Sequence, residues 1–528
     1  MSTDDLPSNI VPLESGLSLR FYEAVLFLYC LKEVKYKAES VKEPDLESDS
    51  GRSSRDSFRC FVNKLGQICD NGSKGKTVTA FAVLQPGQIQ YRFASNQRTS
   101  EELEDVKTYI ANILGFLGSA ADDQLNGVFG TVLERILAFN RPAIEKKLCA
   151  SAQEEEPSLE SFVSQTRELL DTIGQLHNSF FEGFIRDKAQ ADRDPANKTP
   201  WSELRHAFGR LHSYTIAVKV LISMRRRRRE LFEDFEVVAV LSSVRSGCPN
   251  VRRAVDGILK RFPEKMKMAE AYNANLPEEQ QKAMTDKIKA YGTGSKGKFR
   301  PYVHAELLLL DSILTEQREG VTLRFFGEAD YDRYIGCSKP TCRLCKLYID
   351  SHPSGVEFRG GHGNIYHAWR APDIYNEDGV NVAEARRTRQ DIHNKMLETL
   401  RQTIKRWITG HVAERKHHDS NSSPTSYIGA GSSTSYNPHL AAQAFPDSMD
   451  SISTRGAMDD SDDVATAFGR MSIAGDSGRS SSSPSISRSS QETTPVPERN
   501  VGSPFASSGD LKPSINRRQR PLIIEDEE

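Results

Sequence analysis

Two short stretches of the sequence decide which fold to expect: VHAELLLLDSIL at residues 303–314 and YIGCSKPTCRLCKLYIDSH at residues 334–352. The first places a histidine and a glutamate at the start of a strongly apolar helical pattern. The second places three of the chain's eight cysteines within nine residues. Histidine and cysteine are side chains that zinc prefers, so the two stretches together predict a metal site.

The predicted ligands are His304, Cys342 and Cys345. The two cysteines are three residues apart, so on a helix they share a face and reach the same ion. We expect that helix to start near Thr341, where its dipole favours thiolates. His304 lies at the start of the other helix. Two thiolates and one neutral imidazole balance the charge of Zn²⁺ and leave the fourth coordination position for water.

Glu306 and Cys337 distinguish a catalytic zinc site from a structural one. Glu306 is turned by roughly 200° from His304 around an ideal helix, so the two are poor co-ligands. A carboxylate beside the metal can instead take a proton from bound water. Cys337, at the end of the expected strand RYIGCSK (333–339), is the alternative fourth ligand and would close a structural Cys3His site. Coincidental cysteines without any metal are the third interpretation.

The order of these motifs is similar to that of the zinc-dependent cytidine deaminase superfamily. HAE opens an apolar helix, a strand follows, and a C-x-x-C pair stands at the next helix start. The Gly-Cys-Ser-Lys-x-x-Cys-x-x-Cys stretch and the later GHGNIYHAW (361–369) look like the OTT-type, fungal-expanded family of nucleic acid or nucleotide deaminase-like proteins. Carried over residue by residue, the resemblance assigns zinc binding to His304, Cys342 and Cys345, and proton transfer to Glu306.

The resemblance also implies an α/β (α+β) fold: a cytidine deaminase-like core of three layers, split by a large and mainly α-helical insertion. The core would begin with the amphipathic run SFRCFVNKLGQI (57–68) and a hairpin around Pro-Gly at 76–97, and would resume before the histidine helix. The family often holds the substrate sugar with an asparagine where the second strand ends, which implies Asn96 here; an ordinary turn residue is the alternative. The sequence departs from the superfamily at Thr341, where proline usually precedes the first cysteine of the pair.

The periodicity of the chain gives its expected domain boundaries. Apolar residues recur at helical spacing through most of the stretch before the histidine helix, and only FEVVAVLSSV (235–244) fits a strand or a helix end equally well. A long amphipathic helix from about Ala383 to Arg415 closes the ordered part, and the Ser-rich remainder is too polar to fold. We therefore expect an N-terminal helix and flexible linker (1–55), the first part of the core (56–97), the helical insertion (98–298), the second part of the core with the zinc motifs (299–375), the closing helix (376–416) and a disordered tail (417–528).

Composition limits where the protein acts. The formal net charge of -2 means that the protein lacks the overall positive charge that favours non-specific binding to nucleic acid. The longest apolar run is far shorter than a membrane span, and the N-terminus has no apolar signal core, so we expect no membrane association. The scattered cysteines are expected to be small core residues rather than disulfides, which predicts a cytoplasmic or nuclear protein. These cysteines are Cys30, Cys60, Cys69, Cys149 and Cys248.

Two further groups of residues each have two interpretations. Five consecutive arginines, Arg225 to Arg229, fit a nuclear signal or a phosphate-binding patch, or equally an exposed helix paired with the acidic residues that follow. His362, His367 and Trp369 could line a substrate pocket, where a base stacks on an aromatic ring. Packing of Trp369 and Tyr366 on the core, from a loop or an edge strand, is the alternative.

We expect a zinc-dependent enzyme that hydrolytically deaminates a nucleobase in a nucleotide or nucleic acid, with Glu306 as the proton shuttle. The alternative is a non-catalytic deaminase-like scaffold with a structural zinc, whose helical insertion and Ser-rich tail bind protein partners. The fourth zinc ligand distinguishes the two functions, since a water indicates catalysis and the Cys337 sulfur indicates a scaffold.

Overall fold

A computed structural model of the protein describes residues that all lie in one compact unit, Met1–Arg470. The expected tail (417–528) and most of the expected linker lie outside the described residues. The described ranges are 9–35, 53–72, 75–148, 158–176, 179–191, 200–246, 251, 254–292, 300–331, 333–376 and 382–409.

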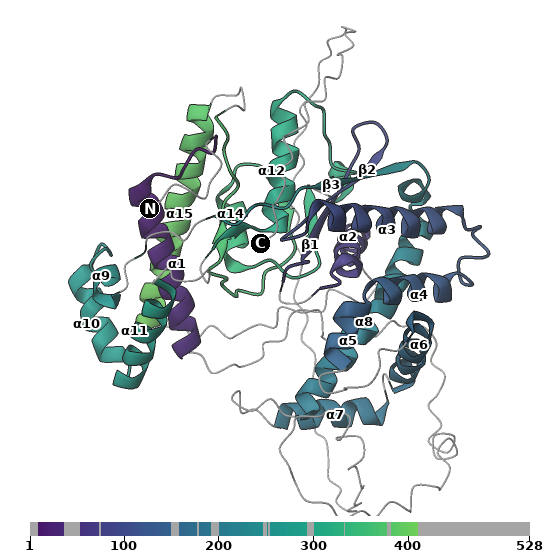
Figure 1. Ribbon diagram of the computed structural model, residues 1–528, viewed down its shortest axis with the longest axis horizontal. Coiled ribbons are helices and arrows are strands. Elements are labelled where there is room, and N and C mark those ends of the chain that lie inside the picture. The colour runs from purple at the N-terminus through teal and green to yellow at the C-terminus, as the bar shows by residue number, and fades with distance from the viewer. Residues whose placement is uncertain are drawn as a thin grey trace, which may run out of the picture. The chain divides into compact units, whose positions relative to one another are not determined.

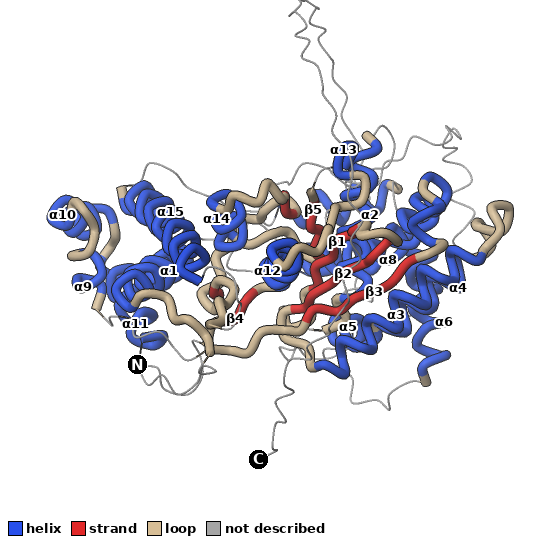
Figure 2. Tube along the Cα trace, turned by 90° about the horizontal axis from the view of Figure 1, so that it is seen from above, coloured by secondary structure: helices blue, strands red, loops and turns tan. Residues whose placement is uncertain are grey.

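A five-stranded mixed sheet with helices on both faces organises this unit (Figure 2). Its strands are β1 (Thr79–Leu84), β2 (Ile89–Ser95), β3 (Phe235–Val240), β5 (Tyr334–Cys337) and β6 (Glu357–Phe358), in the order β3-β2-β1-β5-β6. β1 runs antiparallel to β2 and β5, whereas β3 is parallel to β2 and β6 is parallel to β5. The predicted hairpin is confirmed, because β1 and β2 pair from Thr79↔Ser95 to Leu84↔Gln90. The α/β class is confirmed as well.

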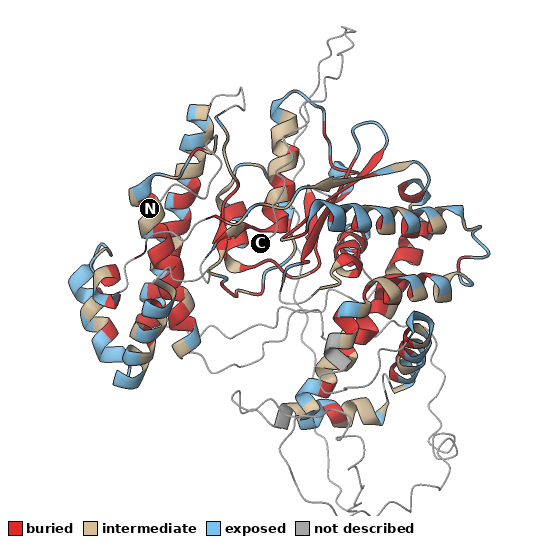
Figure 3. Cartoon of the chain, viewed as in Figure 1, coloured by how far each residue is buried: buried red, intermediate tan, exposed pale blue. Residues whose placement is uncertain are grey.

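Alternate residues of β1 enter two different hydrophobic cores, because successive side chains of a strand point to opposite faces. Ala82 belongs to the core on one face, which we call the site-side core. Phe81 belongs to the core on the other face, which we call the insertion-side core. Figure 3 shows that strands β1, β2 and β5 and the helix faces turned toward them are buried, while the outer helix faces are exposed; the edge strand β3 is mostly half-buried.

The insertion-side core contains buried residues of α2, α3, α4, α6 and α8 together with Phe81 and Val83 of β1. The helices on this side are α2 (Ser54–Cys69), α3 (Ser100–Ser119), α4 (Phe129–Phe139), α5 (Arg141–Leu148), α6 (Leu159–Leu176), α7 (Phe180–Ala191), α8 (Pro200–Arg227), the 3-10 turn η1 (Arg229–Phe232) and α13 (Glu328–Tyr331). Glycine lets α2 approach the sheet closely, since a Cβ on Gly66 would stand 2.7 Å from both the Ser338 nitrogen and the Thr79 oxygen. A larger residue there would push α2 off β1 and β5.

β3 lies within the segment that the sequence assigned to a helical insertion. The sequence left FEVVAVLSSV open between strand and helix, and the structure shows a strand that pairs with β2 from Ile89↔Phe235 to Ala94↔Val240. The chain after β3 then reaches the next strand, β4 (Tyr302–Val303), because the Ser243 hydroxyl accepts a hydrogen bond from the Val303 N–H at 2.9 Å. The inserted segment thus extends the sheet and holds the strand that precedes His304.

The site-side core contains Ala80, Ala82 and Leu84 of β1 and buried residues from helices that are far apart in the sequence (Figure 1). These helices are α1 (Ser15–Lys35), α9 (Val255–Leu259), α10 (Lys265–Asn275), α11 (Glu278–Gly292), α12 (Ala305–Arg318), α14 (Arg343–Ser351) and α15 (Val382–Ile408). α1 packs against α15, α11 and α9. Residues 21–32 of α1 are therefore buried on nearly all sides, while Arg20 and Glu33 toward its two ends are exposed.

Several sequence predictions can be compared directly with these elements. The N-terminal helix and the strand RYIGC are confirmed. Cys30, Cys60 and Cys69 are buried free thiols as expected, while Cys149 and Cys248 lie outside the described residues. α15 ends at Ile408, seven residues before the expected end at Arg415, and everything after residue 409 is outside the described residues. Within the described chain, no helix combines the length and apolarity needed to cross a membrane.

The arginine run ends α8 and is engaged within the protein. Arg225 is 1% exposed, which corrects the expectation of an exposed helix at this residue. Its guanidinium donates hydrogen bonds to the Leu117, Gly118 and Ala120 carbonyls, and so satisfies the C-terminal end of α3. Pairing with the acidic residues that follow is found further along, in Arg228–Glu230 and Arg229–Glu233.

Candidate metal centre

His304 is the N-cap residue of α12, at the position that the sequence predicted. Its backbone is extended, with φ -73° and ψ 154°, so its side chain leaves the end of the helix and does not run along the helix surface. The ring is flanked by two tyrosines, with centroid distances of 5.2 Å to Tyr302 and 6.5 Å to Tyr366. Tyr366 is 37% exposed, so the surroundings of the histidine reach the protein surface.

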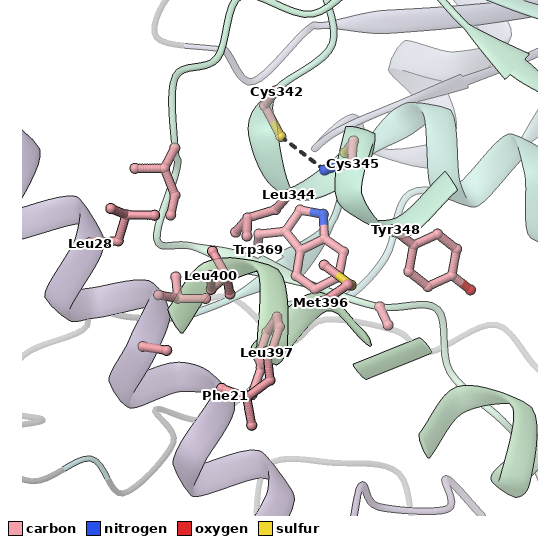
Figure 4. Close-up of a cluster of buried hydrophobic side chains, with 14 of the residues drawn as sticks. Phe21, Leu28, Cys342, Leu344, Cys345, Tyr348, Trp369, Met396, Leu397 and Leu400 are labelled. Atoms are coloured by element: carbon pink, nitrogen blue, oxygen red, sulfur yellow. Dashed lines mark hydrogen bonds between the residues drawn. The ribbon is translucent and has the colours of Figure 1, made fainter. Parts of the chain in front are cut away.

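The two cysteines lie at the start of α14, which begins at Arg343, close to the predicted start near Thr341. Cys342 is the N-cap residue, and its sulfur accepts a hydrogen bond from the Cys345 N–H at 3.4 Å, drawn as the dashed line in Figure 4. A cysteine in the N-cap position uses its sulfur as serine uses its oxygen, and the helix dipole favours negative charge there. Local structure therefore prepares one thiolate before any metal binds.

The three predicted ligands come together. His304 Nδ1 lies 3.6 Å from the Cys342 sulfur and 3.5 Å from the Cys345 sulfur. Among the described residues, these three form the group of histidine, cysteine and acidic side chains whose ligand atoms all lie within 4.8 Å of one another, and all three are buried. Tetrahedral zinc with ordinary Zn–S and Zn–N bonds separates nitrogen from sulfur by about 3.6 Å. The donor set and its spacing therefore fit a zinc ion.

The charges of this group favour thiolate formation. Burial alone would raise the pKa of Cys342, but the hydrogen bond from Cys345 and the nearby His304 hold it well below its usual value. Burial alone would lower the pKa of His304, but the Cys342 thiolate raises it. Burial and the adjacent Cys342 raise the pKa of Cys345. A bound cation would draw the remaining proton from Cys345, since metal binding releases protons from its ligands.

Glu306 lies in the first turn of α12 and is 4% exposed, yet it is not part of the ligand group. Burial raises the pKa of its carboxyl to about 7, although His304 acts in the opposite direction. Such a group exchanges protons readily in both directions.

Cys337, expected as an alternative ligand, is also outside the ligand group. It is fully buried at the end of β5, close enough to Glu306 for each group to affect the pKa of the other. Burial and the negative charge of Glu306 raise the pKa of Cys337 well above its usual value. The structure therefore associates Cys337 with Glu306 and separates it from the two metal-facing cysteines.

Asn96 uses its side-chain amide to join the end of β2 to the start of α12. Its Oδ1 accepts a hydrogen bond from the Ala305 N–H at 2.8 Å, and its Nδ2 donates to the Gly75 carbonyl at 2.9 Å. The side chain is 5% exposed. This placement agrees with the alternative of a structural turn residue, and it joins Asn96 to the residue that follows His304.

Within the GHGNIYHAW stretch, His362 lies near Tyr366, whereas Trp369 lies in the hydrophobic core. His362 is buried, and its Nδ1 accepts a hydrogen bond from the Asn364 N–H at 2.9 Å. Its ring lies 5.8 Å from that of Tyr366. Trp369 is completely buried between α1, α14 and α15, as Figure 4 shows, and leaves no ring face for a substrate. Trp369 therefore takes the core position that was the alternative interpretation.

Sequence reasoning missed residues that support the site from the insertion and from α1. The hydroxyl of Ser243 holds the strand before His304, and Lys32 of α1 donates a hydrogen bond to Asn364 in the loop after α14. Serine and lysine carry no pattern that identifies such distant partners. Tyr302 could have been found, because it is an aromatic residue two positions before the predicted ligand.

The candidate metal centre thus consists of a histidine at one helix start and two cysteines at another, with a buried glutamate two residues after the histidine. Residues 303–373 match the model of the OTT_1508 deaminase-like family (OTT_1508_deam). The matched segment contains all three candidate ligands and Glu306, and it confirms the resemblance noted in the sequence. No curated protein and no solved structure matches the chain.

Proposed function

We propose that the protein is a zinc-dependent hydrolytic deaminase that acts on a nucleobase in a nucleotide or a nucleic acid. The observation that carries this proposal is the approach of His304 Nδ1 to the two cysteine sulfurs, with a buried glutamate nearby that is not a ligand. A structural zinc site has no need for such a glutamate.

His304, Cys342 and Cys345 would hold the zinc ion. Zinc bound to three protein ligands would supply a polarised water of lowered pKa in its fourth position. Cys337 lies outside the group of side chains whose ligand atoms come together, which supports leaving that fourth position to water.

Glu306 would carry the proton through the reaction. Water adds to the amidine carbon of the base, the carbon–nitrogen bond breaks, and ammonia departs, which leaves a carbonyl on the ring. The Glu306 carboxylate would accept a proton from the attacking water and place it on the neighbouring ring nitrogen, then take the second proton from the new hydroxyl as it becomes the carbonyl and deliver it to the departing nitrogen. A pKa of about 7 suits both steps, because the best acid–base catalysts titrate near the working pH.

The element order supports a cytidine deaminase-like core split by an insertion. α2, β1 and β2 are followed, after the intervening segment, by α12, β5 and α14, which is the order of helix, strand, strand, histidine helix, strand and cysteine helix that the resemblance implied. α2 lies on one face of the sheet and α12 on the other, which gives three layers. In this proposal residues 98–298 are the insertion, and 56–97 and 299–375 are the two parts of the core.

Release of ammonia tests the proposal whichever base is the substrate. The zinc-loaded protein is incubated separately with cytidine, adenosine, their monophosphates, and single-stranded DNA and RNA, and free ammonia is measured. We expect release from at least one of these, reduced by about two to four orders of magnitude in Glu306→Gln, which is nearly isosteric but cannot carry the proton.

The zinc content of Glu306→Gln is the control, because loss of zinc would identify Glu306 as a ligand. The absence of any ammonia release above the level of Glu306→Gln from every substrate would overturn the deaminase proposal. That outcome would favour the non-catalytic scaffold.

A further inference from the structure

Arg245, in the segment that follows β3, places a positive charge beside the candidate metal centre. Its guanidinium carbon lies 4.9 Å from the centre of the Tyr302 ring, and that ring lies 5.2 Å from the His304 ring, centre to centre. Together the two distances limit the separation between the guanidinium and the His304 ring to about 10 Å. This separation is on the scale of a single nucleotide, so a molecule with its base at the metal can reach Arg245.

Two hydrogen bonds orient the guanidinium and leave part of it available. Its Nε donates to Gln97 Oε1 at 2.6 Å, and its Nη1 donates to the Arg300 carbonyl at 3.4 Å. Gln97 is itself held, since its Nε2 donates to the Ser243 carbonyl at 3.3 Å and its N–H donates to the Lys76 carbonyl at 3.0 Å. An arginine has five N–H donors, and no described residue accepts a hydrogen bond from Nη2 of Arg245.

The charge of Arg245 is not neutralised by any carboxylate among the described residues. Arg370 contacts the same segment through the Val244 carbonyl at 2.9 Å, but its charge is paired with Asp373. The partners of Arg245 are all neutral: an amide oxygen, a backbone carbonyl and a tyrosine ring. Because the side chain is also only half-buried, it keeps its attraction for an anion from solution.

We propose that Arg245 binds a phosphate of the substrate, so that the site prefers a nucleotide or a single-stranded nucleic acid to a free nucleoside. This proposal rests on the proposed deaminase function, because it assigns the phosphate to a molecule whose base lies at the metal. A guanidinium stacked on an aromatic ring presents its N–H edge in a fixed orientation, and that edge matches the oxygens of a phosphate. Tyr302 would then set the spacing between the phosphate and the metal ligand His304.

Binding measurements test this assignment without turnover. Zinc-loaded Glu306→Gln is titrated in a calorimeter with cytidine, adenosine, their 5′- and 3′-monophosphates, and single-stranded DNA and RNA. At least one phosphorylated probe should bind more tightly than the nucleosides. Adding Arg245→Ala should weaken the binding of that probe by roughly ten- to a hundredfold, the usual effect of losing a hydrogen bond to a charged group. Zinc content and the binding of nucleosides should stay unchanged.

The same titrations distinguish the two sources of the phosphate. Weaker binding of a monophosphate in the Arg245→Ala protein identifies a terminal phosphate of a single nucleotide. Weaker binding confined to the DNA or RNA strands identifies an internal phosphate. In that case the slope of the logarithm of affinity against the logarithm of salt concentration should decrease by about 0.7, because one phosphate contact is lost.

Two further variants separate phosphate binding from other effects of the substitution. Arg135→Ala is the matched control, since Arg135 is an exposed arginine that stacks on Phe116 at 4.1 Å in the insertion-side helices. It removes the same charge and the same kind of contact, and it should leave binding unchanged. Gln97→Glu is nearly isosteric and places a carboxylate against Nε of Arg245. It should weaken the binding of phosphorylated probes although the arginine is still present.

Turnover in the active protein gives a second measurement of the same contact. Arg245→Ala should raise KM for the phosphorylated substrate by a factor similar to its loss of affinity and leave kcat close to that of the wild type. Failure of the deaminase proposal has a different signature: phosphorylated probes would still bind through Arg245, but no substrate would release ammonia.

Three results would overturn the assignment of Arg245. One is the absence of any phosphorylated probe that binds more tightly than the nucleosides. Another is unchanged binding of that probe in the Arg245→Ala protein. The third is an Arg245→Ala protein that loses zinc or binds nucleosides and phosphorylated probes with equally reduced affinity, because this would show that the arginine only packs Tyr302 against the site.

Discussion

The two faces of the sheet are covered in different ways. The insertion-side core contains helices that follow one another in the sequence, from α2 to α8, and its buried arginine serves the end of a neighbouring helix. The site-side core gathers α1, α9 to α12, α14 and α15 from both ends and the middle of the chain, and it contains both cysteines of the ligand group. The metal centre thus belongs to the face built from both ends and the middle of the chain, while the other face is built mainly from the stretch between α2 and η1.

Removal of the metal ligands should produce the largest difference in behaviour between the two faces of the sheet. Cys342→Ser combined with Cys345→Ser should abolish stoichiometric zinc binding, since one imidazole alone holds zinc poorly. Hydrogen exchange should then rise in α12 and α14 and stay unchanged in α3 and α8, because only the site-side core loses a crosslink between two helix starts. Elemental analysis and exchange mass spectrometry measure both effects. Retention of full zinc in the double variant would show that other residues bind the metal.

A matched pair of core substitutions sharpens the comparison. Leu309 of α12 and Leu114 of α3 are both fully buried leucines, one in each core. Each change to alanine should lower the free energy of unfolding by about 2–5 kcal/mol, the usual cost of a cavity of this size.

The two leucine variants should differ in how fast they release zinc to a chelator. Leu309→Ala loosens the helix that carries His304 and should accelerate release, whereas Leu114→Ala should release zinc at the wild-type rate. Equal acceleration in both variants would mean that the two cores respond as one unit and that the proposed separation does not exist.

Substitution of Asn96 should have a smaller effect than loss of the metal ligands or of a core leucine, because Asn96 contributes two hydrogen bonds and little packing. Asn96→Ala leaves the buried Ala305 N–H without its acceptor, which should cost about 1–3 kcal/mol of stability and weaken zinc binding. Asn96→Asp keeps the acceptor and should retain more of both. Denaturant unfolding and chelator competition measure these changes. An Asn96→Ala variant with wild-type stability and zinc affinity but a raised KM would instead support contact with a substrate sugar.

The sequence contained what was needed to find the ligand group, because each motif is local. The spacing of Cys342 and Cys345 and the position of His304 before an apolar run depend on helix geometry alone, and the structure places all three as expected. The hairpin was equally visible from its Pro-Gly turn between β-rich runs. These are features that a short segment determines by itself.

The remaining features depend on partners that are distant in the sequence. The strand character of residues 235–240 is decided by the open edge of β2, and the segment alone fits strand and helix equally. The sequence alone predicts Arg225 at the surface, because it does not show the carbonyls at the end of α3 that accept hydrogen bonds from its guanidinium. Cys337 shares the site-side core with the other two cysteines yet lies outside the ligand group, which the spacing of the cysteines does not reveal.

The position of α1 affects how the protein is made. α1 is the first described element to leave the ribosome and α15 is the last, yet the two pack against each other, and Trp369 lies in contact with both Phe21 of α1 and His393 of α15. The insertion-side core can form as soon as β5 is available, whereas the site-side core must wait for synthesis to reach about residue 408. During that interval the apolar surface of α1 lacks its final partners, so the nascent chain exposes this hydrophobic helix for most of its synthesis. The metal centre is therefore among the last parts of the protein to be completed.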